Sequence, residues 1–523
     1  MAEHQLPKLN TRVRFPSPAP WQAGLLPGLP LFSAFSCLEL GGAEGHNYCG
    51  KNTENPVVKL NSHKVKPARE DVFRSLPVPS ALRIMILPSV ISQLIVLIYN
   101  MADTFYVGQT NNPYMVAATS LILPVFNISI CIAGLAGVGG GSLVSRLLGQ
   151  GREDEARRVG TFSIYLGLSI AALFALAMGL FMRPILGLLG AGENTYDFAK
   201  QYAACVIVAG GIPTVLSNVL SNLLRSIGRS TAAGFGIVLG GVLNIALDPL
   251  FMFVLLPKGQ EVLGAGVATC ISNCVACAYF IVVVLRSGKG AVVTFSPRVG
   301  LAERFSISAV FAVGVPSAVT SFLFDLDYVI LDRLMTSYND LALAAIGIVL
   351  KVERFPLNVG VGICQGMMPL VGYNYSAGNR KRLRDTMRLS LGLGLVIAAV
   401  SILLYELFAT PLIRLFLDDA ETVRLASSFL RARVLATPLM FMSFFTVYLF
   451  QAFGKGNISL LLGTVRWLGF NIPMLYLLNH LVGMYGLVWS QVTADSLNVI
   501  VSIIVYLRFR PPLLRRDAAK AEP

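Results

Sequence analysis

The sequence predicts an all-α polytopic membrane protein with twelve transmembrane helices, and three observations carry this prediction. The chain has 523 residues, of which 55% are hydrophobic and only 13% are charged, whereas a soluble domain carries about 25% charged residues. Hydrophobic runs of 18 or more residues recur from about residue 82 to about residue 507, and each can cross the ~30 Å hydrocarbon core as a helix. The runs are continuous, unlike the ~10-residue alternating segments of a membrane β-barrel.

Residues 1–70 precede these runs and differ from them in composition. They have mixed polarity, many prolines and glycines, and no periodic pattern. They also lack an apolar stretch with a basic start and a small-residue cleavage site, which argues against a secretory signal peptide. We interpret them as a disordered N-terminal extension, or as the product of a wrongly chosen start codon upstream of a natural start between Val58 and Asp71. The second interpretation rests on Asn10–Pro20, which resembles a translated end of a transfer-RNA gene.

The candidate spans form two sets of six. The first set lies near 82–107, 115–142, 159–182, 197–224, 229–256 and 262–286, and the second near 306–334, 341–372, 388–411, 424–452, 457–479 and 482–507. We therefore predict an amino-terminal lobe at 71–290, a cytoplasmic linker at 291–304, a carboxy-terminal lobe at 305–510 and a basic cytoplasmic tail at 511–523.

The two sets look like copies of one another. Pro88-Ser-Val-Ile-Ser corresponds to Pro316-Ser-Ala-Val-Thr, and Leu224-Arg-Ser-Ile-Gly228 corresponds to Phe450-Gln-Ala-Phe-Gly454. Because six spans is an even number, both copies have the same orientation and are related by an axis along the membrane normal, as in several transporter folds.

Basic residues concentrate in one set of loops, which orients the chain. That set holds Arg146, Arg152, Arg157, Arg158, Arg225, Arg229, Arg286, Lys289, Arg298, Arg304, Arg380, Lys381, Arg382, Arg384, Arg388, Lys455, Arg508, Arg510, Arg515 and Arg516. The positive-inside rule predicts that these loops and both termini are cytoplasmic, for a multi-pass protein of the inner (plasma) membrane. It also explains the net charge of +14 without a nucleic-acid partner, and we expect a monomer in the lipid bilayer.

Two carboxylates lie deep within the predicted spans. Asp103 follows Arg83, and Asp248 follows Arg229, and both arginines mark cytoplasmic ends. Each acid is about five helical turns beyond its arginine, which places it in the external half of the bilayer. Because an ionisable group at this depth costs several kcal/mol, it marks a path for protons, ions or charged substrates.

Two neutral polar residues are predicted to join these acids. Asn244 precedes Asp248 by one helical turn, so both occupy one helix face, and Thr269 reaches a similar layer on the next span, about two turns after Glu261. Two carboxylates in a dry site cannot both stay ionised cheaply, so such a cluster can hold a proton or accept Na⁺ in its place. The alternative is that each acid is capped by a neighbouring group and has no transport role.

The second half also carries charged residues within its spans. Its acids are Asp325, Asp327, Asp332, Glu353 and Asp495, and its bases include Arg431, Arg433 and Arg466. We expect Glu353 to be neutralised by its chain neighbours Lys351 and Arg354, and the three arginines to pair with acids. Asp325 and Asp327 are two positions apart, so they point in different directions and only one is expected to face a cavity.

Other motifs do not indicate an enzyme or a metal site. The run Gly137–Gly141 ends an apolar stretch and lacks Gly-Lys-Ser/Thr, which favours close helix packing over nucleotide binding. Cys270, Cys274 and Cys277 lie in an apolar span without nearby histidine, so we interpret them as packing residues. The four histidines offer no catalytic constellation. Pro88 interrupts one backbone hydrogen bond and is predicted to let the first span bend.

Several motifs together resemble the MATE (multidrug and toxic compound extrusion) transporters over about residues 75–508. They are Asn100-Met-Ala-Asp103-Thr, Val144-Ser-Arg-Leu-Leu-Gly-Gln-Gly151, Asn244-x-x-x-Asp248-Pro249, Gly264-Ala-Gly-Val-Ala-Thr269, Pro369-Leu-Val-Gly-Tyr-Asn-Tyr375 and Ala494-Asp495. The chain is most similar to the prokaryotic branch whose coupling acids lie in the amino-terminal half.

The resemblance implies two six-helix lobes and multidrug efflux of organic cations by antiport with H⁺ or Na⁺, without another cofactor. It carries the coupling site onto Asp103, Asn244, Asp248 and Thr269, whereas Asp325 and Asp327 do not match the family's carboxy-lobe pattern. We assign those two acids, with Met367, to the region of the substrate cavity, where the acids would attract cationic and amphipathic substrates. The alternative function is a flippase for lipid-linked sugars or lipids of the same broad superfamily, which would show a cationic central cavity.

Overall fold

The structure, a computed structural model, describes residues 71–288, 290–297, 307–416 and 419–514. Every regular element in these ranges is a helix, so the predicted all-α membrane fold is confirmed. The predictions for residues 1–70, and for parts of the linker and of the basic tail, fall outside the described residues.

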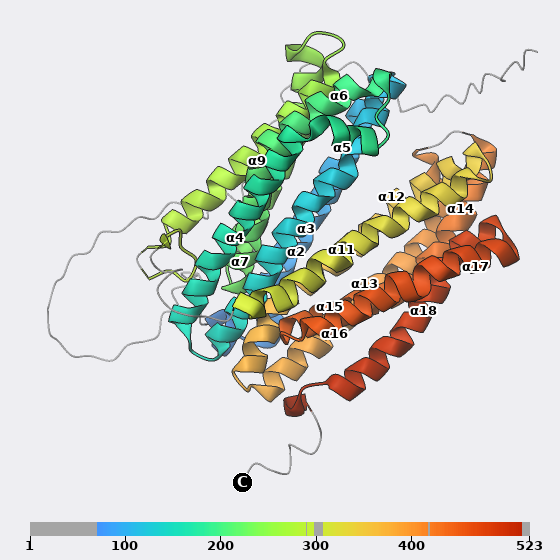
Figure 1. The fold of residues 1–523 in the computed structure, drawn as a ribbon. Helices are drawn as coiled ribbons and strands as arrows, with labels where there is room; N and C mark the ends of the chain where they lie inside the picture. Colours follow the sequence, from blue (N-terminus) through green and yellow to red (C-terminus); the bar gives the residue numbers. More distant parts are fainter. Residues whose placement is uncertain (1–70, 289, 298–306, 417–418, 515–523) are drawn as a thin grey trace, which may run out of the picture. The chain divides into compact units, whose positions relative to one another are not determined.

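The amino-terminal set consists of the helices from α2 to α9 (Figure 1). They are α2 (Val78–Gly108), α3 (Pro113–Gly149), α4 (Glu153–Leu180), α5 (Met182–Leu188), α6 (Glu193–Ala203), α7 (Gly211–Ser226), α8 (Ser230–Pro249) and α9 (Glu261–Leu285). A π-helical segment at Ala204–Ala209 connects α6 to α7, and a second at Leu250–Leu255 extends α8.

The carboxy-terminal set consists of the helices from α11 to α18. They are α11 (Ile307–Thr336), α12 (Asp340–Ser376), α13 (Arg380–Arg414), α14 (Ala420–Val434), α15 (Thr437–Ala452), α16 (Gly456–Thr464), α17 (Ile472–Val482) and α18 (Met484–Phe509). A π-helical segment at Val465–Asn471 joins α16 to α17. Short helical turns at Asp71–Ser75 and Pro512–Leu514 flank the two sets.

Helix ends recur at equivalent places in the two sets. Gly151 and Gly378 follow α3 and α12 with φ of 74° and 72°, and Gly228 and Gly454 follow α7 and α15 with φ of 84° and 72°. Glycine adopts this left-handed conformation without steric cost, which ends each helix in a tight turn.

Nine helices in the described part of the chain are long and apolar enough to cross a membrane, or eleven if each of two bent pairs counts as one span. The bent pairs are α6–α7, at 45°, and α14–α15, at 46°. The predicted span at 341–372 corresponds to α12, which has 37 residues but carries Lys351, Glu353 and Arg354 near its middle. The remaining predicted spans overlap the observed helices.

The two sets contact each other through α2 against α12 and α3 against α11 (Figure 1). Glycines make this approach close. A Cβ atom at Gly139 of α3 would lie 2.9 Å from the Cα atom of Gly314 on α11, and one at Gly366 of α12 would lie 2.7 Å from that of Ile86 on α2. The interpretation of the glycine run as a packing surface is therefore confirmed at Gly139.

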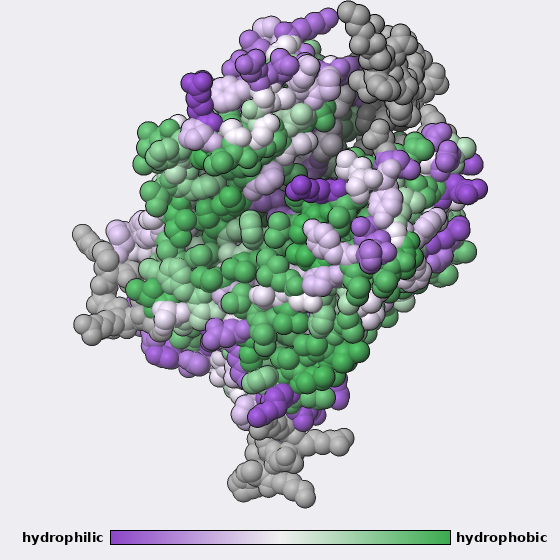
Figure 2. All heavy atoms as spheres, turned by 45° about the vertical axis from the view of Figure 1, so that its right-hand side comes forward, coloured by the Kyte–Doolittle hydropathy of each residue, from purple (hydrophilic) through white to green (hydrophobic). Residues whose placement is uncertain are grey.

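Figure 2 shows the surface that such a fold presents to a bilayer. Hydrophobic residues cover most of the middle of this face, whereas hydrophilic residues gather mainly toward the top and bottom of the view. Exposed residues such as Leu173, Leu403 and Ile503 belong to helices that present apolar side chains outward. This distribution matches a protein whose solvent is hydrocarbon in the middle and water at both ends.

Candidate functional site

The carboxy-terminal part of α8 carries the centre of the candidate site. The Nδ2 atom of Asn244 donates to Oδ1 of Asp248 at 3.0 Å and to Oγ1 of Thr269 on α9 at 3.4 Å. Asn244 and Asp248 are buried, with 3% and 0% of their surface exposed. The structure thus brings together three of the four residues that the sequence assigned to one cluster.

Asp103 of α2 approaches this group through a residue that sequence reasoning missed. Tyr202, a buried residue of α6, donates from its hydroxyl to Oδ2 of Asp103 at 3.4 Å. The tyrosine interacts electrostatically with both Asp103 and Asp248, and the two carboxylates also interact with each other. Its only signal in the sequence is a phenol hydroxyl on an otherwise apolar helix face, and a buried hydroxyl of this kind needs a partner.

Each acid of this cluster keeps one carboxylate oxygen unused. Oδ1 of Asp103 and Oδ2 of Asp248 are buried, and neither has a hydrogen-bond partner among the described residues. The ion pairs found within the described ranges do not include either acid. Buried acceptors are satisfied in most proteins, so two unused carboxylate oxygens beside neutral amide and hydroxyl groups can bind a proton or a small hard cation.

Small residues on α8 and α9 bring the helices that carry the site residues close together. A Cβ atom at Gly234 of α8 would lie 2.9 Å from Cβ of Pro88, and one at Gly241 would lie 2.6 Å from Cγ2 of Ile95 on α2. Gly264 similarly lets α9 approach the π-helical segment after α8. A Cβ atom at this position would lie 2.9 Å from Cα of Met252. Small residues of this kind allow helix backbones to pack closely in membranes.

Pro88 lies within α2, which remains helical on both sides of it. The oxygen of Met85, one turn earlier, accepts hydrogen bonds from the hydroxyls of Ser89 and of Ser230 on α8, at 3.0 and 2.7 Å. These two hydroxyls join α2 to α8 at the level of the proline. The predicted bending at Pro88 concerns a change of conformation and stays a prediction.

The acids of the carboxy-terminal set are arranged differently. Nε of Arg433 on α14 lies 2.7 Å from Oε2 of Glu353, and Nε of Arg466 lies 2.8 Å from Oδ1 of Asp495 on α18. None of these four side chains is more than 5% exposed. The predicted pairing of Arg433 and Arg466 with acids is therefore confirmed, while Arg431 lies 3.8 Å from Glu406 at the surface.

The expected partners of Glu353 were wrong. Lys351 and Arg354 are its neighbours in the chain, but Lys351 is exposed and Arg354 lies over the ring of Tyr328, 5.0 Å from its centroid. Helical residues one or two positions apart do not face each other. The neutralising cation comes instead from Arg433, 80 residues later in the chain.

The three predicted substrate-cavity residues occupy different surroundings. Asp325 is half-buried on α11 and lies beside Asn127 of α3, at the contact between the two sets. Asp327 is 3% exposed, near Asn471 and the paired Arg466, and its Oδ1 has no partner among the described residues. Met367 is fully buried in the main hydrophobic core.

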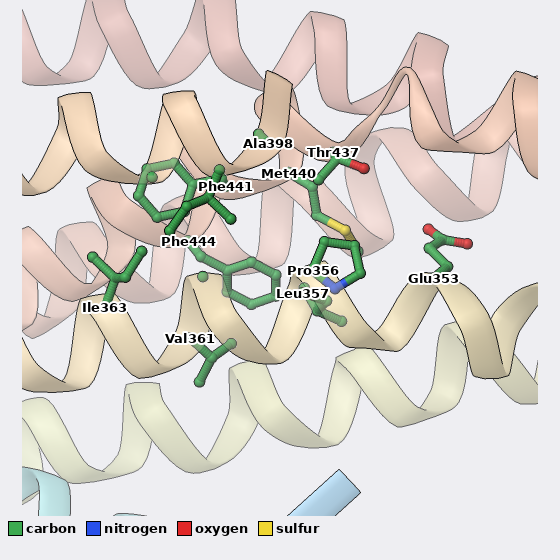
Figure 3. A pocket seen from close by; sticks show the side chains of 13 residues that line it. Glu353, Pro356, Leu357, Val361, Ile363, Ala398, Thr437, Met440, Phe441 and Phe444 are labelled. Atoms are coloured by element: carbon green, nitrogen blue, oxygen red, sulfur yellow. The ribbon is translucent and has the colours of Figure 1, made fainter. Parts of the chain in front are cut away.

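One pocket of the carboxy-terminal set extends from Glu353 along α12, α13 and α15 (Figure 3). The carboxylate lies at one end, beyond Pro356 and Met440, and Phe441 and Phe444 line the rest. Because Arg433 already holds this carboxylate, the pocket offers mainly apolar surface. Within the described residues, no group of three or more His, Cys, Asp or Glu side chains is placed to hold a metal ion.

Comparison with known proteins gives a family match over most of the helical region. A family model described as MatE matches the chain twice, at residues 88–250 and 316–477. The two matches begin at Pro88 and Pro316, the same two prolines that the sequence repeat places in correspondence.

Named relatives cover nearly all of the same region. The multidrug export protein MepA of Staphylococcus aureus is 29% identical over 437 residues, covering 83% of this chain and 95% of MepA. MepA of Staphylococcus saprophyticus is 30% identical over 421 residues, covering 80% of this chain and 92% of its own. A crystal structure of a mutant of the Vibrio cholerae MATE transporter VcmN shares the fold, with a TM-score of 0.78 and 23% identity over 84% of this chain and 98% of that one.

Proposed function

The chain belongs to the MATE family of transporters. We propose that it exports organic cations and other amphipathic xenobiotics by antiport with H⁺ or Na⁺. The relatives named as multidrug export proteins support the export of drugs. We propose further that it works as a monomer in the plasma membrane, with both termini in the cytoplasm.

The single observation that carries the coupling part of the proposal is the pair of unused carboxylate oxygens on Asp103 and Asp248. Within the described residues, these acids have only neutral hydrogen-bonding partners, Tyr202 and Asn244. A proton or Na⁺ that binds here therefore changes the charge of the site rather than displacing a resident cation. In a dry environment such a change of charge is worth several kcal/mol.

The proposed cycle uses this change of charge to alternate between two conformations. With the cavity open to the cytoplasm, the ionised pair favours a cationic substrate in the space between the sets. A cation that arrives from outside binds at Asp103 and Asp248 and lowers the negative charge of the pair. We propose that α2 then rearranges around Pro88 and that the affinity for the drug falls, so that the drug leaves outward. A coupling ion shifts the conformations only by its differential affinity for them, and moving from 1:99 to 99:1 requires about 5.5 kcal/mol.

Purified protein in liposomes tests this proposal. An imposed pH gradient or Na⁺ gradient should drive ethidium transport, and the gradient that works identifies the coupling ion. Asp103→Asn should abolish driven transport while the amount of inserted protein stays unchanged. Asp332→Asn, at an exposed position of α11, is the matched control and should transport normally. Wild-type rates from Asp103→Asn would contradict the coupling role.

A further inference from the structure

A buried arginine that has no carboxylate partner among the described residues lies where the two sets of helices meet. Arg225, in the last turn of α7, has 6% of its surface exposed. Its Nη2 atom donates to Oγ of Ser92 on α2 at 3.3 Å, and its Nε atom has no partner among the described residues. None of the ion pairs within the described ranges includes it. A buried charge without a counter-charge is costly, so this guanidinium calls for an anion.

A small cavity opens beside this guanidinium. It is lined by residues of α3, α7, α12 and α15, namely Gly137, Val138, Gly141, Ser142, Ser145, Asn222, Arg225, Ser226, Gln365, Met368, Pro369 and Tyr448. Its volume is about 20 Å³, enough for one water-sized guest, which needs ~10–15 Å³, and far too small for a drug. No aspartate or glutamate is among these lining residues.

The serines of the lining have already used their hydroxyl protons on backbone oxygens. Ser142 donates to the oxygen of Gln451 at 2.6 Å, Ser145 to that of Ser142 at 3.0 Å, and Ser226 to that of Leu223 at 2.7 Å. Hydrogen bonds for a guest can therefore come from Arg225 and the second amide proton of Asn222, both of the amino-terminal set, and from Gln365 and Tyr448 of the carboxy-terminal set. These side chains carry donor groups, as an anion requires.

The sequence repeat shows that packing alone does not demand a charge at this position. Gln451 is the residue of α15 that the repeat places in correspondence with Arg225 of α7. It is also buried, at 2% exposure, and its amide donates to Oγ of Ser459 at 3.2 Å. One copy of the repeat thus fills this turn with a neutral amide, whereas the other retains a cation facing a cavity.

We propose that this cavity binds a single monatomic anion of the chloride class, held by Arg225 and by the Gln365 and Tyr448 side chains across the contact. Because the ligands come from both sets, the anion stabilises the conformation in which the sets touch here. The proposal concerns binding and does not depend on which substrate or coupling ion the transporter uses.

Thermal unfolding of the purified full-length protein in a lipid-free neutral detergent tests the site. Potassium gluconate is replaced stepwise by potassium chloride at constant ionic strength, so that no sodium is present. The unfolding midpoint of the wild-type protein should rise saturably by about 2 °C or more, and bromide should act similarly. A wild-type midpoint that is the same in gluconate and chloride, or that rises only with inorganic phosphate, would overturn the proposal.

Two variants and a control assign the effect to this cavity. Arg225→Gln introduces the residue of the other repeat and should remove the chloride increment, whereas persistence of the increment contradicts the site. Arg431→Gln removes an arginine whose side chain is 50% exposed and should keep the increment. If Arg225→Gln does not accumulate, Tyr448→Phe should raise the half-saturating chloride concentration roughly threefold or more, the effect of one lost hydrogen bond. An unchanged concentration would count against the proposal.

Discussion

The two sets of helices hold most of the acids in their spans in different ways, and Asp327, which lies near the paired Arg466 with its Oδ1 atom unpartnered among the described residues, is the exception in the carboxy-terminal set. In the amino-terminal set, Asp103 and Asp248 accept hydrogen bonds from a tyrosine and an asparagine, and each keeps an oxygen without a partner among the described residues. In the carboxy-terminal set, Glu353 is held by Arg433 through Nε and Nη2, at 2.7 and 3.4 Å. Asp495 is held in the same manner by Arg466.

The charge of its hydrogen-bonding partner determines whether a carboxylate within a membrane can bind a further cation. An arginine is a permanent cation that does not lose its proton in proteins, so an acid paired with it is already neutralised and has little affinity for a further cation. An acid with only neutral partners remains open to an exchangeable cation, at the cost of desolvation. We infer that the acids paired with arginine are structural and that Asp103 and Asp248, whose hydrogen-bonding partners are neutral, form the proposed exchange site.

The largest effect should come from breaking a pair. Glu353→Gln leaves the guanidinium of Arg433, which is 2% exposed, without its counter-charge. Removal of one partner from a buried ion pair costs about 3–5 kcal/mol. We expect a sharp fall in the thermal unfolding midpoint, measured by size-exclusion profiles after heating to a series of temperatures. The amount of folded protein extracted from the membrane, measured by the same profile without heating, should also fall.

A double variant tests whether the lost stability comes from the unpaired charge of Arg433 or from the altered side chain at position 353. Glu353→Gln combined with Arg433→Gln removes both charges and should recover most of the lost stability, since replacement of a whole buried pair is often nearly neutral. If the single variant were as stable as the wild-type protein, the pair would not be structural and the contrast between the two sets would fail.

The same kind of change in the amino-terminal set should leave stability intact and remove activity. Asp248→Asn replaces a buried carboxylate that has no cationic partner among the described residues with a neutral group of similar shape. We expect the unfolding midpoint to stay the same or rise, while gradient-driven ethidium export falls at least tenfold, equivalent to about 1.4 kcal/mol or more. A variant that loses stability and activity together would instead assign Asp248 a structural role.

This contrast was only partly predictable from the sequence. Helical periodicity placed Asn244 one turn before Asp248, and the structure joins them by a hydrogen bond. Contacts between helices that are far apart in the chain were not predictable, because they depend on packing angles and on bends such as the one between α6 and α7. Tyr202 reaches Asp103, and Arg433 reaches Glu353, through such contacts.

A smaller effect is expected from the neutral partner of Asp103. Tyr202→Phe removes the hydroxyl that donates to Asp103 at 3.4 Å but keeps the ring that packs in the apolar cluster around α6. Hydrogen bonds to charged groups contribute about 1.5–3 kcal/mol, and the length of this one points to the lower end. We expect export to fall severalfold, with little change in the unfolding midpoint.

The matched control for that variant is Tyr405→Phe in the carboxy-terminal set. The hydroxyl of Tyr405 donates to the backbone oxygen of Val352 at 2.9 Å, so its removal deletes a buried tyrosine hydrogen bond whose acceptor is a backbone oxygen and not a carboxylate. It should lower the unfolding midpoint slightly and leave the export rate near that of the wild-type protein. Equal losses of export from both variants would mean that any buried tyrosine hydroxyl matters alike, and that the neutral environment of Asp103 has no special part in coupling.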